Sequence, residues 1–190
     1  SGDTVLLNDP YAGGTHLPDL TLVSPVYIAG TLAFFVANRA HHADVGGMTP
    51  GSMPLSTHIV QEGVRIPPVK LIRQGEMDND LLSIVLANVR TPVERSGDLE
   101  AQIAANHIGR QRLIEISEKY GVAEVGQYMS ALQDYSERIV RKTLQQIPNG
   151  RYAETDFLDN DGITDQAVPI SVTVIIEDAS AIIDFSGSAP

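Results

Sequence analysis

The chain has 190 residues, of which 43% are hydrophobic and 19% are charged, a composition typical of a globular protein rather than a disordered one. The formal net charge of -11 argues against nucleic acid as a partner, because a phosphate backbone is bound through clustered Lys and Arg. Cysteine is absent, which excludes disulfides and thiolate catalysis. No apolar run reaches the roughly 20 residues of a membrane helix and no signal-peptide pattern opens the sequence, so we expect a cytoplasmic protein without membrane contact.

The first part of the chain is expected to consist of strands and loops. Residues 4–7, 20–28 and 31–38 are rich in Val, Leu, Phe and Thr and predict three strands. Ala29-Gly30 predicts a two-residue hairpin turn between the last two of them. The nearly continuous apolar stretch 31–37 predicts a strand that is buried on both faces.

The middle of the chain predicts helices. Residues 80–89 form a short helix candidate, and Ser96 is placed to cap a long helix over 97–120. Gly121 is a natural stop, and a second long helix is expected over 122–146. Together the two long helices predict an αα-hairpin.

The end of the chain returns to strands, so that strands, helices and strands follow one another. This order favours the α+β class, here an antiparallel-rich sheet with a β-hairpin, a long αα-hairpin and C-terminal strands. We expect one domain over 1–190, or a fragment of a larger protein, because the sequence lacks an initiator Met and stops directly after a strand-like run. Its expected regions are the strands and loops of 1–72, the helices of 79–147 and the C-terminal strands of 151–190.

Two stretches rich in His and Asp, side chains that commonly bind metals, flank the predicted hairpin: residues 8–19 and 38–47. The first contains His16-x-x-Asp19 and the second contains His41-His42, so three of the five histidines lie here. Each motif alone is weak, since both are common in surface loops. Their conjunction is stronger, because imidazoles and carboxylates that converge from separate loops are the usual way to assemble a metal site.

The lengths of the hairpin legs predict that the two motifs meet. Asp19 lies ten residues before Ala29, and His41 lies eleven residues after Gly30, so both fall at the open end of the hairpin. Adjacent strand residues point to opposite faces, so only one of the paired histidines is expected to reach a given metal. We favour His41 as the ligand beside His16 and Asp19, and expect His42 to orient ligands or shuttle a proton.

Other polar residues are expected to be structural. Asp9 precedes Pro and Asp44 shortly precedes Gly-Gly, positions that are typical of turns. His58 and His107 have no obvious partners in the sequence. The charged residues Glu94, Arg95 and Asp98 are interpreted as an ordinary capped helix start with a surface ion pair, in preference to a substrate or phosphate clamp.

Several long and unusual motifs resemble the hydantoinase B/oxoprolinase family. That family includes the B components of N-methylhydantoinase, 5-oxoprolinase and caprolactamase, together with the related acetone and acetophenone carboxylases. The resemblance spans nearly the whole chain and rests on residues 8–19, 37–54, 61–63, 90–99 and 184–188.

The resemblance implies a two-component, ATP-dependent system. A partner A component with an actin/hexokinase-like ATPase fold phosphorylates the amide, lactam or enolate oxygen of the substrate, and the B component handles the activated intermediate at a mononuclear metal. The family's ligands map onto His16, Asp19 and His41. A further carboxylate ligand of some members lies upstream of the motif, outside this sequence. Family B components are several times longer, which agrees with a fragment.

By the same resemblance, the expected reaction is hydrolysis of a phosphate-activated cyclic amide, such as a hydantoin or 5-oxoproline, with Zn, Mn or Fe as the metal. His42 or Asp44 would accept or relay a proton, and the Gly- and Pro-rich loop 46–54 would shape the substrate pocket. Two alternatives stay open. One is a subunit of a ketone carboxylase, and the other is a non-catalytic scaffold that docks the ATPase partner. In each case a hetero-oligomer is expected.

Overall fold

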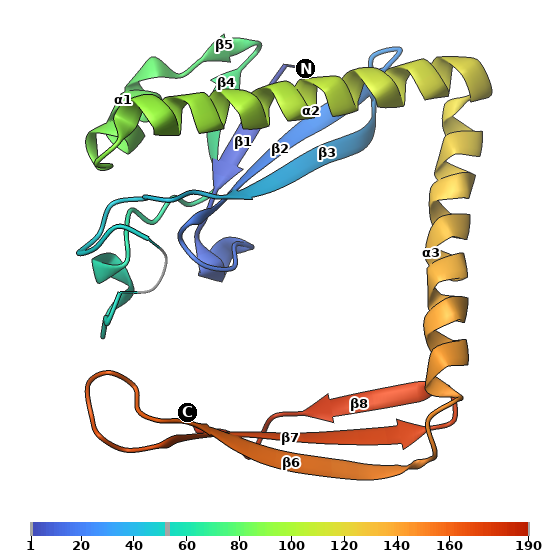
Figure 1. Ribbon diagram of the computed structural model, residues 1–190. Helices are drawn as coiled ribbons and strands as arrows, with labels where there is room; N and C mark the ends of the chain where they lie inside the picture. Colours follow the sequence, from blue (N-terminus) through green and yellow to red (C-terminus); the bar gives the residue numbers. More distant parts are fainter. Residues whose placement is uncertain (1, 52–53, 190) are drawn as a thin grey trace. The chain divides into compact units, whose positions relative to one another are not determined.

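The computed structural model describes residues 2–51 and 54–189, and contacts divide the chain into two units, Ser1–Val122 and Ala123–Pro190 (Figure 1). The helical region expected at 79–147 is thus shared between the units. Among the described residues the fold mixes helices with two antiparallel sheets, which confirms the predicted class. None of the helices within this part of the chain carries an apolar stretch of the length that a bilayer requires.

A five-stranded antiparallel sheet organises the first unit, with strand order β3-β2-β1-β4-β5 in the described residues. Its two longest strands, β2 and β3, form the predicted hairpin, and β1 and β4 extend the sheet on the far side of β2. The strands are β1 (Thr4–Leu7), β2 (Asp19–Ile28), β3 (Thr31–His41), β4 (Val69–Arg73) and β5 (Glu76–Met77).

The hairpin turn is the predicted one. Ala29 and Gly30 both have positive φ angles, 49° and 81°, as a two-residue turn of the primed type requires. β3 is one residue longer than β2, and a register shift between Val26 and Tyr27 absorbs the difference. As a result Asp19, the first residue of β2, lies directly opposite His41, the last residue of β3.

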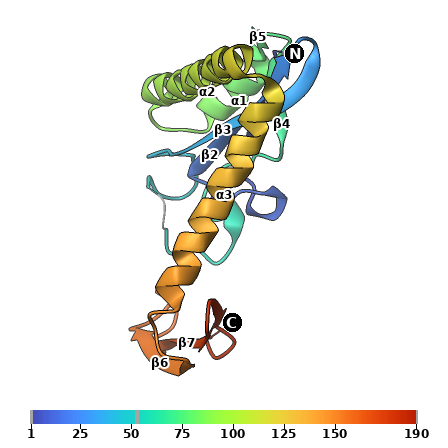
Figure 2. The same ribbon diagram turned by 90° about the vertical axis from the view of Figure 1, so that its right-hand side faces the viewer.

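The prediction that β3 is buried on both faces is wrong. β3 is the edge strand of the sheet, and its residues alternate between half-buried and exposed; Phe35, for example, is 62% exposed. The apolar run reflects packing on one side only, where helix α2 lies along β2 and β3 (Figures 1 and 2). Val36 and Ala40 lie on the half-buried side.

The first unit also contains the 3-10 turns η1 (Pro10–Ala12) and η2 (Ile59–Gln61) and the helices α1 (Asn79–Ala87) and α2 (Pro92–Tyr120). The predicted start of the long helix at Ser96 is wrong, because α2 begins at Pro92 with Thr91 as its N-cap. Proline suits the first helical position, where its fixed φ is already helical and no N–H is required. The C-terminal stop at Gly121, which has a φ of 88°, is confirmed.

The hydrophobic core of the first unit lies between the sheet, α1 and α2. It includes Leu17, which belongs to the loop before β2 and is fully buried. The loop that carries His16 and Asp19 is therefore anchored in the core rather than free at the surface. The buried members of the core are Leu6, Leu17, Leu20, Leu22, Val45, Ile66, Leu71, Val85 and Leu99.

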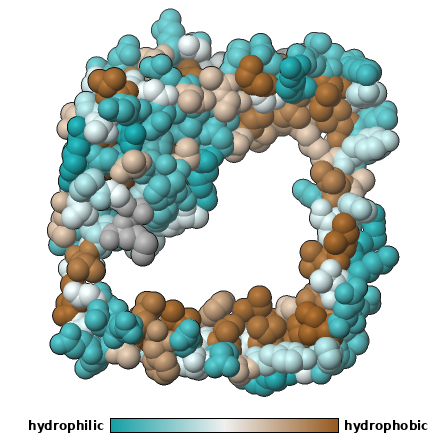
Figure 3. All heavy atoms as spheres, in the orientation of Figure 1, coloured by the Kyte–Doolittle hydropathy of each residue, from teal (hydrophilic) through white to brown (hydrophobic). Residues whose placement is uncertain are grey.

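The second unit consists of most of α3 (Val122–Leu144) and a three-stranded antiparallel sheet formed by β6 (Gly150–Leu158), β7 (Val168–Glu177) and β8 (Ser180–Asp184). Val125 and Ile176 are the buried hydrophobic residues of this unit's described part. Apolar side chains gather along the β6–β8 sheet (Figure 3). Since α2 and α3 fall mainly in different units, the predicted αα-hairpin stays a prediction.

The buried side chain of Asn8 ties three segments of the first unit together. Its Nδ2 donates to the carbonyl oxygens of Leu17 and Val64 at 2.8 and 2.9 Å, and its Oδ1 accepts the Ile66 N–H at 2.6 Å. Because Asn8 is fully buried, water cannot replace these partners.

We expect Asn8→Ala to lower the free energy of unfolding by about 2–3 kcal/mol, because it leaves an N–H and two carbonyls buried without partners. Urea denaturation followed by circular dichroism measures this loss. The matched control is Asn88→Ala, an exposed asparagine whose amide donates to the Ile84 carbonyl, for which a change within about 0.5 kcal/mol is expected. Equal losses in both variants would contradict the structural role of Asn8.

Candidate metal centre

The three predicted ligand residues meet at the open end of the β2–β3 hairpin. His16 comes from the loop before β2, Asp19 starts β2 and His41 ends β3. One ligand atom from each residue lies within 4.8 Å of the other two, and the two imidazole rings have centroids 5.1 Å apart. The hairpin register thus brings together side chains that are 22 residues apart in the sequence.

The spacing of these atoms fits a single cation. The Oδ1 atom of Asp19 lies 2.9 Å from His16 Nε2 and 3.1 Å from His41 Nδ1. Ligand atoms about 2.0–2.2 Å from a tetrahedral zinc lie roughly 3.3–3.6 Å from one another, so only small adjustments are needed to hold an ion. Two imidazoles and one carboxylate suit Zn, Mn or Fe, and leave at least one position for water or substrate.

The carboxylate of Asp19 is held from both sides. Its Oδ2 accepts a hydrogen bond from the Thr15 hydroxyl at 2.9 Å, opposite the two histidines. Burial by itself raises the pKa of Asp19, but the hydrogen bonds from Thr15, His16 and His41 outweigh it, so the pKa lies below its ordinary value. Asp19 is therefore ionised at neutral pH, as a metal ligand must be.

The loop between His16 and Asp19 is rigidly anchored. Leu17 and Pro18 are both buried. The Leu17 carbonyl accepts the Asn8 amide, and the Pro18 carbonyl accepts the main-chain N–H of His42 at 2.8 Å. The loop is thereby fastened both to the core and to the end of β3.

His42 and His41 take opposite directions, as strand alternation predicts. The His41 side chain is 49% exposed in the cluster, whereas His42 is only 2% exposed and its Nε2 lies 2.9 Å from Oε1 of Gln102 on α2. Burial lowers the pKa of His42, outweighing the Gln102 hydrogen bond and the Asp98 charge, which both raise it. His42 therefore packs under the site, and its predicted proton-relay role stays a prediction.

Asp44 is also buried, and its oxygens are occupied by structural partners. Oδ1 accepts from Arg90 Nη1 at 2.8 Å and from the Gly46 N–H at 3.1 Å, while Oδ2 accepts the Arg90 main-chain N–H at 2.6 Å. Arg90 also donates to the Gly47 carbonyl. The turn that the sequence indicated at Asp44 is present, and the ion pair joins it to the segment before α2. The catalytic role expected for Asp44 stays a prediction.

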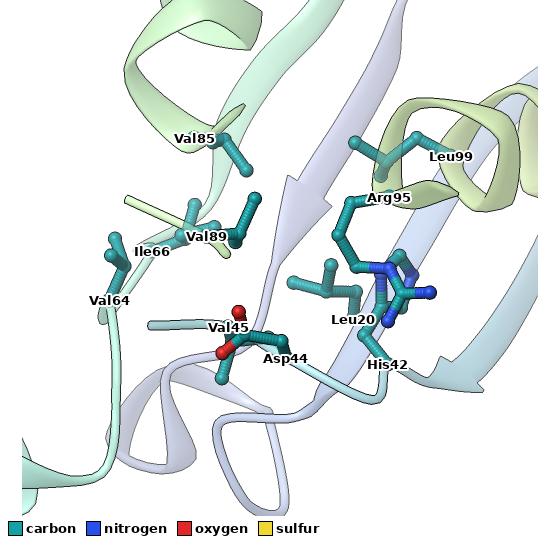
Figure 4. Close-up of a pocket in the computed structure, with 10 residues that line it drawn as sticks. All are labelled: Leu20, His42, Asp44, Val45, Val64, Ile66, Val85, Val89, Arg95 and Leu99. Atoms are coloured by element: carbon teal, nitrogen blue, oxygen red, sulfur yellow. The ribbon is translucent and has the colours of Figure 1, made fainter. Parts of the chain in front are cut away.

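His42 and Asp44 both line a small, mostly apolar hollow (Figure 4). Arg95, from the first turn of α2, lies in it beside His42 and pairs with Asp98 at 3.0 Å. The ion pair expected in 94–98 is therefore present, but the prediction that it lies at the surface is wrong for its arginine. Its arginine is largely buried, with Nε and Nη1 lacking a partner among the described residues.

The remaining sequence predictions are local. Asp9 accepts the Tyr11 N–H and caps η1, and His58 caps η2, so both are structural as expected. His107 lies beside Arg110 on α2. In the loop 46–54, residues 52 and 53 lie outside the described part of the chain, and Met48 N–H donates to the Gln61 carbonyl.

The contacts of several residues that shape the site could not be predicted from the sequence, although Asn8, Thr15 and Arg90 lie in motifs that carry the family resemblance. Thr15, Asn8, Arg90 and Gln102 act through partners that are distant in the sequence or in an irregular loop. Periodicity and spacing do not encode such contacts. The (i, i+4) spacing of Gln102 and Asn106 is the one pattern that marks two polar side chains on the buried face of α2.

Fold and cluster together define an α+β protein with two imidazoles and a carboxylate at the open end of a long hairpin. The sequence profile of the hydantoinase B/oxoprolinase family matches residues 1–190, the whole chain. The chain belongs to this family.

Relatives with similar sequences are considerably longer. The chain is 42% identical over 195 residues to 5-oxoprolinase of Dictyostelium discoideum, a match that covers 98% of this chain and 15% of that protein. It is 34% identical over 192 residues to caprolactamase subunit beta of Pseudomonas jessenii, covering 100% of this chain and 33% of that subunit. The chain therefore spans a third or less of the length of these relatives.

Solved structures share the fold. The ATP-dependent caprolactamase from Pseudomonas jessenii matches 96% of this chain and 32% of its own, with a TM-score of 0.86 at 34% identity. A nucleotide-free acetone carboxylase matches 100% of this chain and 27% of its own, with a TM-score of 0.89 at 20% identity. At that identity the likeness to acetone carboxylase shows the fold alone.

If Asp44 acts as a structural anchor, Asp44→Asn will destabilise the protein by about 1–3 kcal/mol, because the buried acceptor for Arg90 loses its charge. Its divalent-metal content should stay at the wild-type level. Chemical denaturation and metal analysis measure the two quantities. The control is Glu115→Gln in the exposed Arg112–Glu115 pair, where a change near zero is expected. Loss of metal from the Asp44 variant would show that the residue belongs to the metal site.

Proposed function

We propose that this chain is part of the B component of an ATP-dependent hydantoinase/oxoprolinase-type system. The reaction is hydrolysis of a phosphate-activated cyclic amide, such as a hydantoin or 5-oxoproline, at a mononuclear metal. His16, Asp19 and His41 are the proposed ligands. The observation that carries the proposal is the convergence of their ligand atoms within 4.8 Å of one another.

Membership of the family supports the reaction class. The 5-oxoprolinase and caprolactamase relatives are both named for cyclic amides, and the caprolactamase structure is described as ATP-dependent. The name "subunit beta" supports a hetero-oligomer, in which a hydantoinase A-type ATPase subunit uses ATP to activate the substrate. We place the system in the cytoplasm, where ATP is available, with neither membrane nor nucleic acid as a partner.

The chain's own residues hold and orient the metal. Asp19 contributes a carboxylate that is ionised at neutral pH, and Thr15 fixes its orientation. His16 and His41 present their nitrogens towards the same oxygen, with side chains 39% and 49% exposed, so the cluster is open to substrate on one side. A divalent metal supplies Lewis-acid activation of water or of a carbonyl oxygen when bound there.

Loss of an outer-sphere contact typically lowers metal affinity about 10–100-fold. We expect a larger loss in each of the ligand variants His16→Ala, Asp19→Asn and His41→Ala. Inductively coupled plasma mass spectrometry and metal titration of the protein from the complete reading frame measure this effect. His107→Ala is the matched control, because this imidazole lies on α2 away from the cluster. Stoichiometric metal in all three ligand variants would contradict the proposed centre.

Product analysis with the ATPase partner separates the possible reactions. A hydrolase forms the ring-opened amino acid from a lactam as ATP is consumed. A ketone carboxylase incorporates labelled bicarbonate instead. A scaffold subunit supports neither reaction through its own cluster, so the ligand variants would turn over like wild type. The proposal requires ring opening that is lost in the His16 and His41 variants.

A further inference from the structure

A ladder of buried amides fastens α2 to the β2–β3 hairpin directly beneath the site. Gln102 and Asn106 lie one helical turn apart and are only 6% and 4% exposed. Gln102 Nε2 donates to the Leu20 carbonyl at 3.0 Å and to Asn38 Oδ1 at 2.6 Å. Asn38 Nδ2 in turn donates to the Gln102 carbonyl at 2.7 Å and to Asn106 Oδ1 at 2.9 Å.

The main-chain carbonyls determine which way each amide points. A carbonyl oxygen only accepts, so the Gln102 atom facing Leu20 must be its NH₂ group. Its Oε1 therefore faces His42 and also only accepts, which makes His42 Nε2 the donor. The Gln102 amide cannot be flipped without losing the hydrogen bond to the Leu20 carbonyl. The network thus selects the imidazole form of His42 with the proton on Nε2.

His42 connects Gln102 to the segments that carry the proposed ligands. Its ring is held by Gln102, and its main-chain N–H donates to the Pro18 carbonyl, between His16 and Asp19. The residue before it is the ligand His41. A shift of His42 would therefore displace both strands of the cluster at once.

Asn106 makes a second set of contacts that does not involve His42. Its Nδ2 donates to the Leu22 carbonyl at 3.2 Å and to Ser24 Oγ at 3.1 Å, further along β2 from the site. The side chains of Gln102 and Asn106 make three hydrogen bonds each. The two residues thus offer a matched pair, with equal numbers of buried bonds to the same hairpin but only one of them linked to the ligands.

We propose that Gln102 is a positioning residue for the metal centre: it locks His42 in the Nε2–H form, and His42 thereby sets the relative position of His41 and the His16–Asp19 loop. This inference rests on the proposed metal site. It assigns to α2, about 60 residues away in the sequence, control over the geometry of ligands that it does not touch. Outer-sphere contacts of this kind are worth roughly 10–100-fold in metal affinity.

The test compares Gln102→Met with Asn106→Leu in the protein expressed from its complete reading frame. Each variant keeps the side-chain length and removes three hydrogen bonds. Melting temperatures report the structural cost, which should be similar in the two variants. Titration with Zn²⁺ and Mn²⁺ should show affinity about 10–100-fold weaker in Gln102→Met and near wild type in Asn106→Leu. Equal affinities in the two variants would overturn the proposal.

Gln102→Glu provides a rescue variant, because it keeps the acceptor for His42 Nε2–H while losing the donors to Leu20 and Asn38. It should recover most of the metal affinity that Gln102→Met loses, even where its melting temperature stays low. A merely structural role predicts instead that affinity follows stability across all the variants.

Nitrogen-15 NMR of the histidines in the metal-free wild type gives a readout that depends on neither folding of a variant nor metal. We expect His42 signals that show a proton on Nε2, the atom that faces Gln102 Oε1; protonation at Nδ1 alone would overturn the proposal. If wild type binds no divalent metal, the proposed function itself is wrong. If it binds metal and Gln102→Met binds equally well, only the positioning role fails.

Discussion

The structure of the site depends on the pairing of Asp19 with His41 across the ends of β2 and β3. Side chains alternate strictly along a strand, so a slip of one residue would turn His41 towards α2 and His42 outwards. The primed turn at Ala29-Gly30 and the single register shift near Val26 together prevent that slip. Backbone geometry some ten residues from the site thus decides which imidazole joins the carboxylate.

Buried polar contacts hold the exposed cluster in place. Asn8 and His42 bind the two carbonyls between His16 and Asp19. These bonds lie in a region from which water is excluded, where an unmade hydrogen bond is costly, so the loop has few alternative conformations. The side chains of the candidate ligands His16 and His41 stay partly exposed, as the proposed access of substrate requires. The buried contacts of Asn8 and His42 therefore make the loop rigid, while the neighbouring side chains of the cluster remain accessible to solvent.

The two units differ in how completely they bury their apolar surface. The first has a contiguous core in which Leu17, Leu20 and Leu99 join the site loop, β2 and α2. The second consists of a three-stranded sheet and a helix, and among its described residues Val125 and Ile176 are the buried hydrophobic side chains. Because the candidate ligands and their supporting contacts all belong to the first unit, the chemistry proposed for the chain depends on that unit.

Local sequence pattern alone determined the hairpin, its turn and the pairing of Asp19 with His41, because strand period and turn chemistry depend on consecutive residues. It also determined family membership through long motifs. It misplaced the start of α2 by taking Ser96 as the cap, whereas Pro92 occupies the first helical position. It also took the apolar run of β3 for full burial, although β3 lies at an edge of the sheet. Only the tertiary structure decided that His42 and Asp44 pack against Gln102 and Arg90, because those contacts join segments more than 40 residues apart that no local rule relates.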